Sequence, residues 1–371
     1  MRYILAGSLI FLPLLLQSNV FGQTPELKLE TGEDIYKAGC VGCHGPNGKG
    51  QPETTLGFEK PDQFPDFSDC NGTTREKTFD WTATIHEGGA GRGWSEIMPS
   101  FSEALSVEQI HKVTDYLRTL CDDKAWPLGE LNLPRALYTE KAFPEDEAVL
   151  TSAVNTKGPG GVSNELVYER RFGARNQLEL SAPFSFLERG NNSWVGGVGD
   201  LVAGYKRVLF SNSRSGSIFS LQGEANLPTG NRAQDLGAGV TTFGTFAEFG
   251  QTLPKYGFLQ VQGGAELPAN TKKAAQGVFI NSALGKTFAQ NGGFGRIWTP
   301  MVEVLMNRDL LTGAKTNLDI VPEVQISLSK RQHVMASVGL RRPVNNIYGR
   351  STQLAFYVLW DWFDGSLRDG W

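Results

Sequence analysis

Two cysteines and a histidine near the start of the chain have the spacing of a covalent haem attachment site. Residues 40–44 read Cys-Val-Gly-Cys-His, which is the C-x-x-C-H pattern. The two thiols can add across the vinyl groups of a haem, and the imidazole of His44 can become an axial ligand of the iron. A zinc half-site or a chance pair is the alternative, but the sequence holds no second C-x-x-C or H-x-H pair to complete a zinc tetrahedron. We therefore predict one covalently bound haem c as the cofactor, attached through Cys40 and Cys43.

Met98 is the candidate for the second axial ligand. It is the only methionine between residues 45 and 125, and Pro99 follows it. A proline at that position keeps the loop off the helical path, which suits a segment that must hold a thioether sulfur against iron. His86, at the end of a predicted helix, is the main competitor. We interpret His111 as a surface residue of an amphipathic helix.

Short helices and a glycine-rich loop are predicted to position these residues. Helices are expected to start near residues 33, 80 and 106, and the loop of residues 45–50 directly follows the haem motif. Ser106 and Gln109 have the spacing of a capping box at the start of the last helix. Arg92, in a glycine-rich stretch before Met98, is interpreted either as a partner for a haem propionate or as a surface arginine.

Taken in order, the CVGCH motif, the GPNGKG loop, the MPSF segment and the C-terminal amphipathic helix resemble a class I cytochrome c domain. The resemblance covers residues of about 30–121, within a predicted mono-haem domain of residues 23–121. It implies a small all-α fold with a single low-spin haem that transfers one electron at a time. It also implies that His44 and Met98 are the two axial ligands of the iron.

The two remaining cysteines, Cys70 and Cys121, lie away from the haem motif. In an oxidising compartment a leftover pair usually forms a bridge, so we predict a disulfide between them. Two inert buried thiols are the alternative.

The first 22 residues are typical of a secretory signal peptide. Arg2 precedes an apolar run over residues 4–16, and Gly22 is a suitable cleavage position. The run is short for a transmembrane helix, although an uncleaved anchor is the alternative. Export also fits covalent haem attachment and the additional cysteine pair.

The composition changes at about residue 145. Beyond that point the chain has no cysteine, and apolar and polar residues alternate with period two over segments of roughly ten residues. In one segment Leu178 and Leu180 alternate with Gln177 and Glu179. We predict about 12 such strands in residues 147–371. The pattern fits a transmembrane antiparallel β-barrel with its apolar face toward lipid, or a soluble β-sandwich with that face inward.

Three features favour the barrel. The strands exceed the five or six residues that are about average in soluble sheets. Aromatic residues gather near strand ends, and the chain finishes with an aromatic strand and Trp371, as outer-membrane barrels commonly do. Glutamates recur in mid-strand on the polar face, where they would hydrate a lumen or give it a mild cation preference. These glutamates are Glu179, Glu224, Glu266, Glu303 and Glu323.

Tight connections alternate with longer loops rich in glycine and asparagine. Short turns belong on the periplasmic side of outer-membrane barrels, so this alternation predicts a periplasmic haem domain. Residues 197–201 and 227–230 resemble the transporter-like outer-membrane porins associated with phenol-degradation pathways. That resemblance implies a pore or channel fold over residues of about 147–371 without fixing a substrate.

Residues 122–146 join the two halves. They contain Pro127, Pro134 and Pro144 with mixed charges, and they show no repeat. Because they are too apolar for a free tether, we predict an ordered linker packed on one domain.

The sequence thus predicts an electron carrier of the cell outer membrane, with its cytochrome domain in the periplasm. The implied partners are a periplasmic redox protein and outer-membrane lipid. The alternative is a porin for a small-molecule solute in the lumen, with the haem domain as plug, sensor or redox gate. No hydrolase triad, P-loop or dinucleotide fingerprint suggests an enzyme, and a Met98 ligand would close the open haem position that a peroxidase-like reaction needs. The net charge of -4 gives no reason to expect nucleic acid binding.

Overall fold

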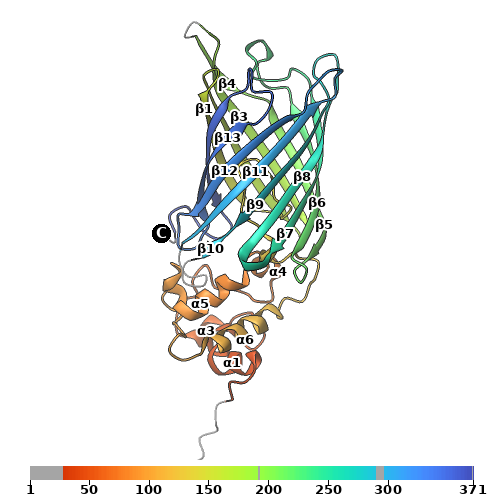
Figure 1. The fold of residues 1–371 in the computed structure, drawn as a ribbon. Coiled ribbons are helices and arrows are strands. Elements are labelled where there is room, and N and C mark those ends of the chain that lie inside the picture. The colour runs from red at the N-terminus through yellow and green to blue at the C-terminus, as the bar shows by residue number, and fades with distance from the viewer. Residues whose placement is uncertain (1–27, 191–192, 290–295, 370) are drawn as a thin grey trace, which may run out of the picture.

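A computed structural model describes residues 28–190, 193–289, 296–369 and 371. In this part of the chain a helical unit sits at one end of a tall β-barrel (Figure 1). The predicted signal peptide, residues 1–22, lies outside the described residues. None of the described helices has the length and apolarity needed to cross a membrane.

The helical unit is built on the contact between its first and last helices. Gly32 permits this approach, because a Cβ at that position would collide with the carbonyl oxygen of Lys112. A capping box at Thr31 starts the first helix, and the predicted capping box at Ser106 starts the last. The described helices of this unit are α1 (Gly32–Gly39), α2 (Val41–His44), α3 (Glu53–Leu56), α4 (Cys70–Thr73), α5 (Thr78–Gly91) and α6 (Val107–Arg118).

The second half is one antiparallel sheet that closes on itself. Its strands are β1 (Glu147–Lys157), β2 (Gly161–Phe172), β3 (Asn176–Glu188), β4 (Trp194–Val198), β5 (Leu201–Asn212), β6 (Ser217–Leu227), β7 (Thr242–Leu253), β8 (Gly257–Pro268), β9 (Gly277–Lys286), β10 (Phe288–Ala289), β11 (Ile297–Asp309), β12 (Asn317–Ser327), β13 (Val334–Pro343) and β14 (Thr352–Asp361). Short 3-10 turns η2 (Arg232–Gln234) and η3 (Pro254–Tyr256) lie between strands.

The sheet is a barrel of 12 spanning strands, as predicted. β4 and β5 both pair with β3, and β9 and β10 both pair with β11. Each of these two pairs therefore counts as one interrupted spanning strand. The barrel closes where β1 pairs with β14, from Glu147 opposite Asp361 to Lys157 opposite Thr352. Closure removes the unpaired edges that an open sheet would present inside a membrane.

The side chains decide between the barrel and the soluble sandwich. On β3, Leu178 and Leu180 are 52% and 59% exposed, whereas Gln177 and Glu179 are 0% and 6% exposed. The same inversion recurs around the wall, with apolar residues outside and Gln, Glu and Ser inside. An apolar outer surface of this kind is stable only against lipid. The barrel is therefore of the outer-membrane type.

The helical unit packs at the end of the barrel that carries the tight connections (Figure 1). Arg175, in the turn between β2 and β3, donates from Nε to the carbonyl oxygen of Ala125 at 2.9 Å. Arg331, in the turn between β12 and β13, donates to the carbonyl oxygen of Gly93 at 2.5 Å. These contacts fix the helical unit against the short-turn rim.

Candidate functional site

The haem motif follows directly from α1. Tyr36 is fully buried on that helix, and its hydroxyl donates to the carbonyl oxygens of Gly45 at 2.6 Å and His44 at 3.2 Å. This bond holds the turn at the end of α2. Cys40 lies between α1 and α2, Cys43 is exposed on α2, and both thiols are free.

His44 is only 9% exposed, and its imidazole contacts two phenylalanine rings. Its centroid is 4.9 Å from that of Phe64 and 4.8 Å from that of Phe67. Burial lowers the pKa of His44 to about 4, so the ring is neutral at physiological pH, which is the form that ligates iron. Nδ1 is buried with no hydrogen-bond partner among the described residues. A buried, neutral and unpartnered imidazole beside two free thiols fits a covalently bound haem.

The Met98 loop is held against the end of α5. The backbone N–H of Gly89 donates to the carbonyl oxygen of Met98 at 3.0 Å, and that of Phe101 donates to the carbonyl oxygen of Ile85 at 3.0 Å. Gly88 has a φ of 76°, and a Cβ there would lie 2.9 Å from the Met98 carbonyl oxygen. Because only glycine fits this approach without strain, the local sequence positions the loop.

Met98 and Cys40 both pack against one hydrophobic core, the cluster that contains Tyr36 and Phe67. Cys40 and Met98 thus lie on the same core, and His44 contacts that core through Phe67. The competitor His86 is on α5, with its Nδ1 2.9 Å from Glu87 Oε1. His111 is exposed on α6, as interpreted from the sequence.

Cys70 and Cys121 form a disulfide, as predicted, with their Cα atoms 5.3 Å apart. The bridge ties the start of α4 to the segment that follows α6. It therefore closes the helical unit immediately before the linker begins.

A buried ion pair lies where the helical unit meets the barrel. Arg92 is 2% exposed, and its Nη2 lies 2.7 Å from Asp80 Oδ1 and 3.4 Å from the carbonyl oxygen of Arg331. Arg92 is therefore a buried junction residue and not the surface arginine of our second interpretation. Burial raises the pKa of Asp80, and the Arg92 guanidinium opposes that rise.

The linker runs inside the barrel. Its short helix η1 (Gly129–Leu131) starts at the rim, and the segment 131–146 continues into the lumen; we call residues 129–146 the plug. Side chains of the wall bind the backbone of the plug at many points. Gln260 Nε2 donates to the Pro134 carbonyl oxygen at 2.8 Å, and Ser220 Oγ donates to the Ala142 carbonyl oxygen at 2.5 Å.

The tip of the plug reaches the middle of the barrel. Glu303, at the centre of β11, accepts from the Thr139 N–H at 2.6 Å, the Thr139 hydroxyl at 2.6 Å and the Tyr138 N–H at 3.1 Å. Glu323, on β12, accepts from the Leu137 N–H at 3.4 Å. The plug then returns to the same rim, because β1 starts at Glu147 opposite the last residue of β14.

Charged side chains are also paired inside the lumen. Arg135 of the plug lies 2.5 Å from Glu147 and 3.1 Å from Glu169. Lys141 lies 2.5 Å from Glu145, and Lys206 of the wall donates to the Lys141 carbonyl oxygen at 2.7 Å. Buried charges need such partners, so the lumen is built to hold this segment.

Sequence reasoning missed the plug. It placed Glu303 and Glu323 on the lumen wall correctly, but assigned them to hydration or cation preference and not to binding the linker backbone. Two wall glycines make room for the plug: a Cβ on Gly339 would lie 2.7 Å from Leu137 Cδ1, and one on Gly250 would lie 3.0 Å from Leu133 Cδ1. Small residues at these positions leave room for the linker leucines.

Residues 29–121 match the model of the cytochrome c family. Among curated protein sequences, none matches this chain.

Among the solved structures similar to this chain are an outer membrane channel and a porin. An outer membrane channel from Pseudomonas putida F1 has a TM-score of 0.45 and 14% identity, over 62% of this chain and 99% of that chain. The NanC porin has a TM-score of 0.40 and 5% identity, over 57% and 97% of the two chains. LpxR from Salmonella typhimurium has a TM-score of 0.37 and 10% identity, over 58% and 99%. At these identities the likeness is one of fold alone.

Proposed function

Because the chain joins a cytochrome c domain to an outer-membrane barrel, we propose that it carries single electrons at the periplasmic face of the outer membrane. In this proposal Cys40 and Cys43 bind one haem c covalently, and His44 and Met98 are its axial ligands. When bound, the haem supplies a one-electron couple, whose potential a methionine ligand raises. The observation that carries the proposal is the buried, neutral and unpartnered His44 ring beside two free thiols.

The residues around the site then have defined tasks. Phe64 and Phe67 fix the plane of the His44 ring and exclude water from it. Gly88 and Gly89 hold the Met98 loop against the core. Cys43 lies at the surface, so the side of the domain that carries the attachment thiols is open to a periplasmic redox partner.

The barrel serves as the anchor in this proposal. A single haem cannot pass electrons across a hydrocarbon core about 30 Å thick, so the electron enters and leaves on the periplasmic side. The plug supports this role, because side chains of the wall bind it in the half of the lumen next to the helical unit. The second candidate is a channel for a small solute; in that case the plug, and not the haem domain, would be the gate.

The test is Met98→Ala in the full-length protein, with His86→Gln as the matched control. We expect Met98→Ala to change the visible spectrum of the reduced haem and to lower its midpoint potential, and His86→Gln to leave both unchanged. An unchanged spectrum and potential in Met98→Ala would overturn the axial assignment. Protease accessibility in intact cells tests the orientation: digestion of the haem domain from outside would contradict a periplasmic location.

A further inference from the structure

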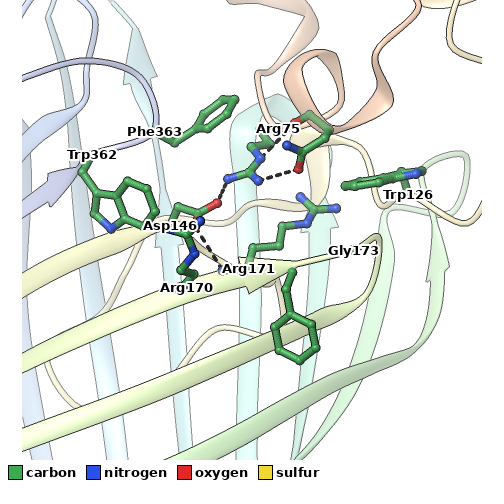
Figure 2. A pocket seen from close by; sticks show the side chains of 10 residues that line it. Arg75, Trp126, Asp146, Arg170, Arg171, Gly173, Trp362 and Phe363 are labelled. Atoms are coloured by element: carbon green, nitrogen blue, oxygen red, sulfur yellow. Dashed lines mark hydrogen bonds and ion pairs between the residues drawn. The ribbon is translucent and has the colours of Figure 1, made fainter.

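A cleft of about 330 Å³ lies where the helical unit, the linker and the barrel rim meet (Figure 2). Its lining includes three arginines, Arg75, Arg170 and Arg171, but a single carboxylate, that of Asp146. The arginines come from two places: Arg75 follows α4, and the other two end β2. The lining therefore has an excess of positive charge.

Arg75 has its partners within the protein. It forms an ion pair with Asp146, and it donates from Nε and Nη2 to the Asn71 backbone oxygen at 2.9 Å and side-chain oxygen at 2.6 Å. Asp146 also accepts from the backbone N–H of Arg171 at 3.1 Å. The one carboxylate of the cleft is thus already engaged.

Arg171 is different. It is 3% exposed, and only its Nη2 has a partner, the Ala174 carbonyl oxygen at 2.8 Å. Its Nε and Nη1 are buried with no hydrogen-bond partner among the described residues. The guanidinium lies 4.9 Å from the ring centroid of Trp126, and Figure 2 shows the two side by side.

No ion pair within the described residues compensates this charge. The nearby carboxylate of Glu145 is held by Lys141 at 2.5 Å. A buried guanidinium with unpaired N–H groups is unfavourable, and an oxyanion beside Nη1 would accept from it in a charge-assisted hydrogen bond. An anion in the cleft would supply an acceptor for this unpaired charge.

The outer side of the cleft is built like a membrane interface. The Arg170 guanidinium lies 5.3 Å from the ring centroid of Trp362, which stacks on Tyr168 at 5.8 Å. Tyr168 and Phe172 are 41% and 42% exposed on the outer wall at the short-turn end. Aromatic rings and arginines at this depth are typical of the headgroup region, with acyl chains along the apolar wall above.

We propose that this cleft binds a phosphate anion, and that its source is the headgroup of a phospholipid in the membrane leaflet next to the helical unit. Nη1 of Arg171 donates to a phosphate oxygen, and Arg170 adds positive charge at the outer side of the cleft. The lipid then joins β2, the linker and the Arg75 segment at one point. The site is independent of the haem and of the proposed electron transfer.

Native mass spectrometry of the delipidated, haem-loaded, full-length protein tests this. The probes are a phosphatidylglycerol, a diacylglycerol with the same acyl chains, and inorganic phosphate as competitor. We expect phosphatidylglycerol to bind and diacylglycerol not to bind. We expect Arg171→Gln to weaken phosphatidylglycerol binding at least about tenfold, since it removes a charge-assisted donor. Arg214→Gln, in an exposed turn at the same end, is the matched control and is expected to bind like wild type.

Each outcome is decisive. Equal binding of the two lipids, or unchanged binding by Arg171→Gln, overturns the site. Inorganic phosphate that binds as tightly as phosphatidylglycerol supports the anion site and overturns the lipid as its source. If Arg171→Gln does not fold, the exposed Arg170→Gln variant decides, with a weakening of about threefold expected and unchanged binding counting against the site.

Discussion

Release of the plug is the most direct test of what the lumen does. Glu303 accepts three hydrogen bonds from Tyr138 and Thr139, so Glu303→Ala leaves two buried backbone N–H groups and one hydroxyl unpaired. Each such group costs about 1–3 kcal/mol. Water that enters the enlarged lumen offsets part of this cost. A cost of about 3 kcal/mol, the lower end of the range for three groups, still shifts the equilibrium between the bound and the released tip of the plug by about a hundredfold.

Single-channel recording in planar bilayers measures the result. We expect Glu303→Ala to show openings of higher conductance than wild type, and trypsin to cleave it faster after Arg135 and Lys141 of the plug. Glu266→Ala is the matched control, because Glu266 is an exposed glutamate of β8 on which no plug contact depends. A Glu303→Ala protein with wild-type conductance and wild-type trypsin resistance would refute the reasoning that these hydrogen bonds hold the plug.

Two further predictions concern the junction and the wall. Burial, and secondarily the Asp80 carboxylate, raises the pKa of Glu76 to about 7 from its ordinary 4.5, so the folded protein binds more protons than the unfolded chain between these pH values. The free energy of unfolding should therefore fall by about 1–3 kcal/mol as pH rises from 4.5 through 7. Glu76→Gln should reduce this pH dependence, which thermal unfolding at several pH values in that range measures as the change of Tm with pH. Gly339→Ala should destabilise the bound plug by about 1–3 kcal/mol, because its Cβ would lie 2.7 Å from a Leu137 methyl. Gly223→Ala is the control and should have no such effect, since a Cβ there would meet open space. Trypsin sensitivity of the plug compares the two variants.

The parts that sequence reasoning predicted are those with local rules. The capping box at Ser106 needs only Gln109 three residues later, and the outward Leu178 and inward Gln177 follow from the period of a strand. The haem residues stay a prediction, which rests on their order along the chain. The disulfide followed from counting cysteines.

The position of the plug inside the lumen could not be predicted from any local sequence pattern. Its contacts join residues far apart in sequence, such as Thr139 and Glu303, and they use backbone N–H groups that every residue offers. The apolar residues Leu131, Leu133 and Leu137 indicated that the linker is ordered, but burial inside the lumen and burial on an outer surface demand the same composition. The unpaired Nε and Nη1 of Arg171 were equally hidden, because whether they find an acceptor depends on neighbours in space.

The path of the plug determines how far the cytochrome domain could move away from the barrel. The segment enters and leaves the lumen at the same rim, so it can slide out without threading through the barrel and without opening the pairing of β1 with β14. At about 3.3 Å per extended residue, residues 129–146 would then become a tether of about 60 Å. The cytochrome domain would then change from a fixed cap into a mobile carrier on this tether, and the lumen would be the place where the tether is stored.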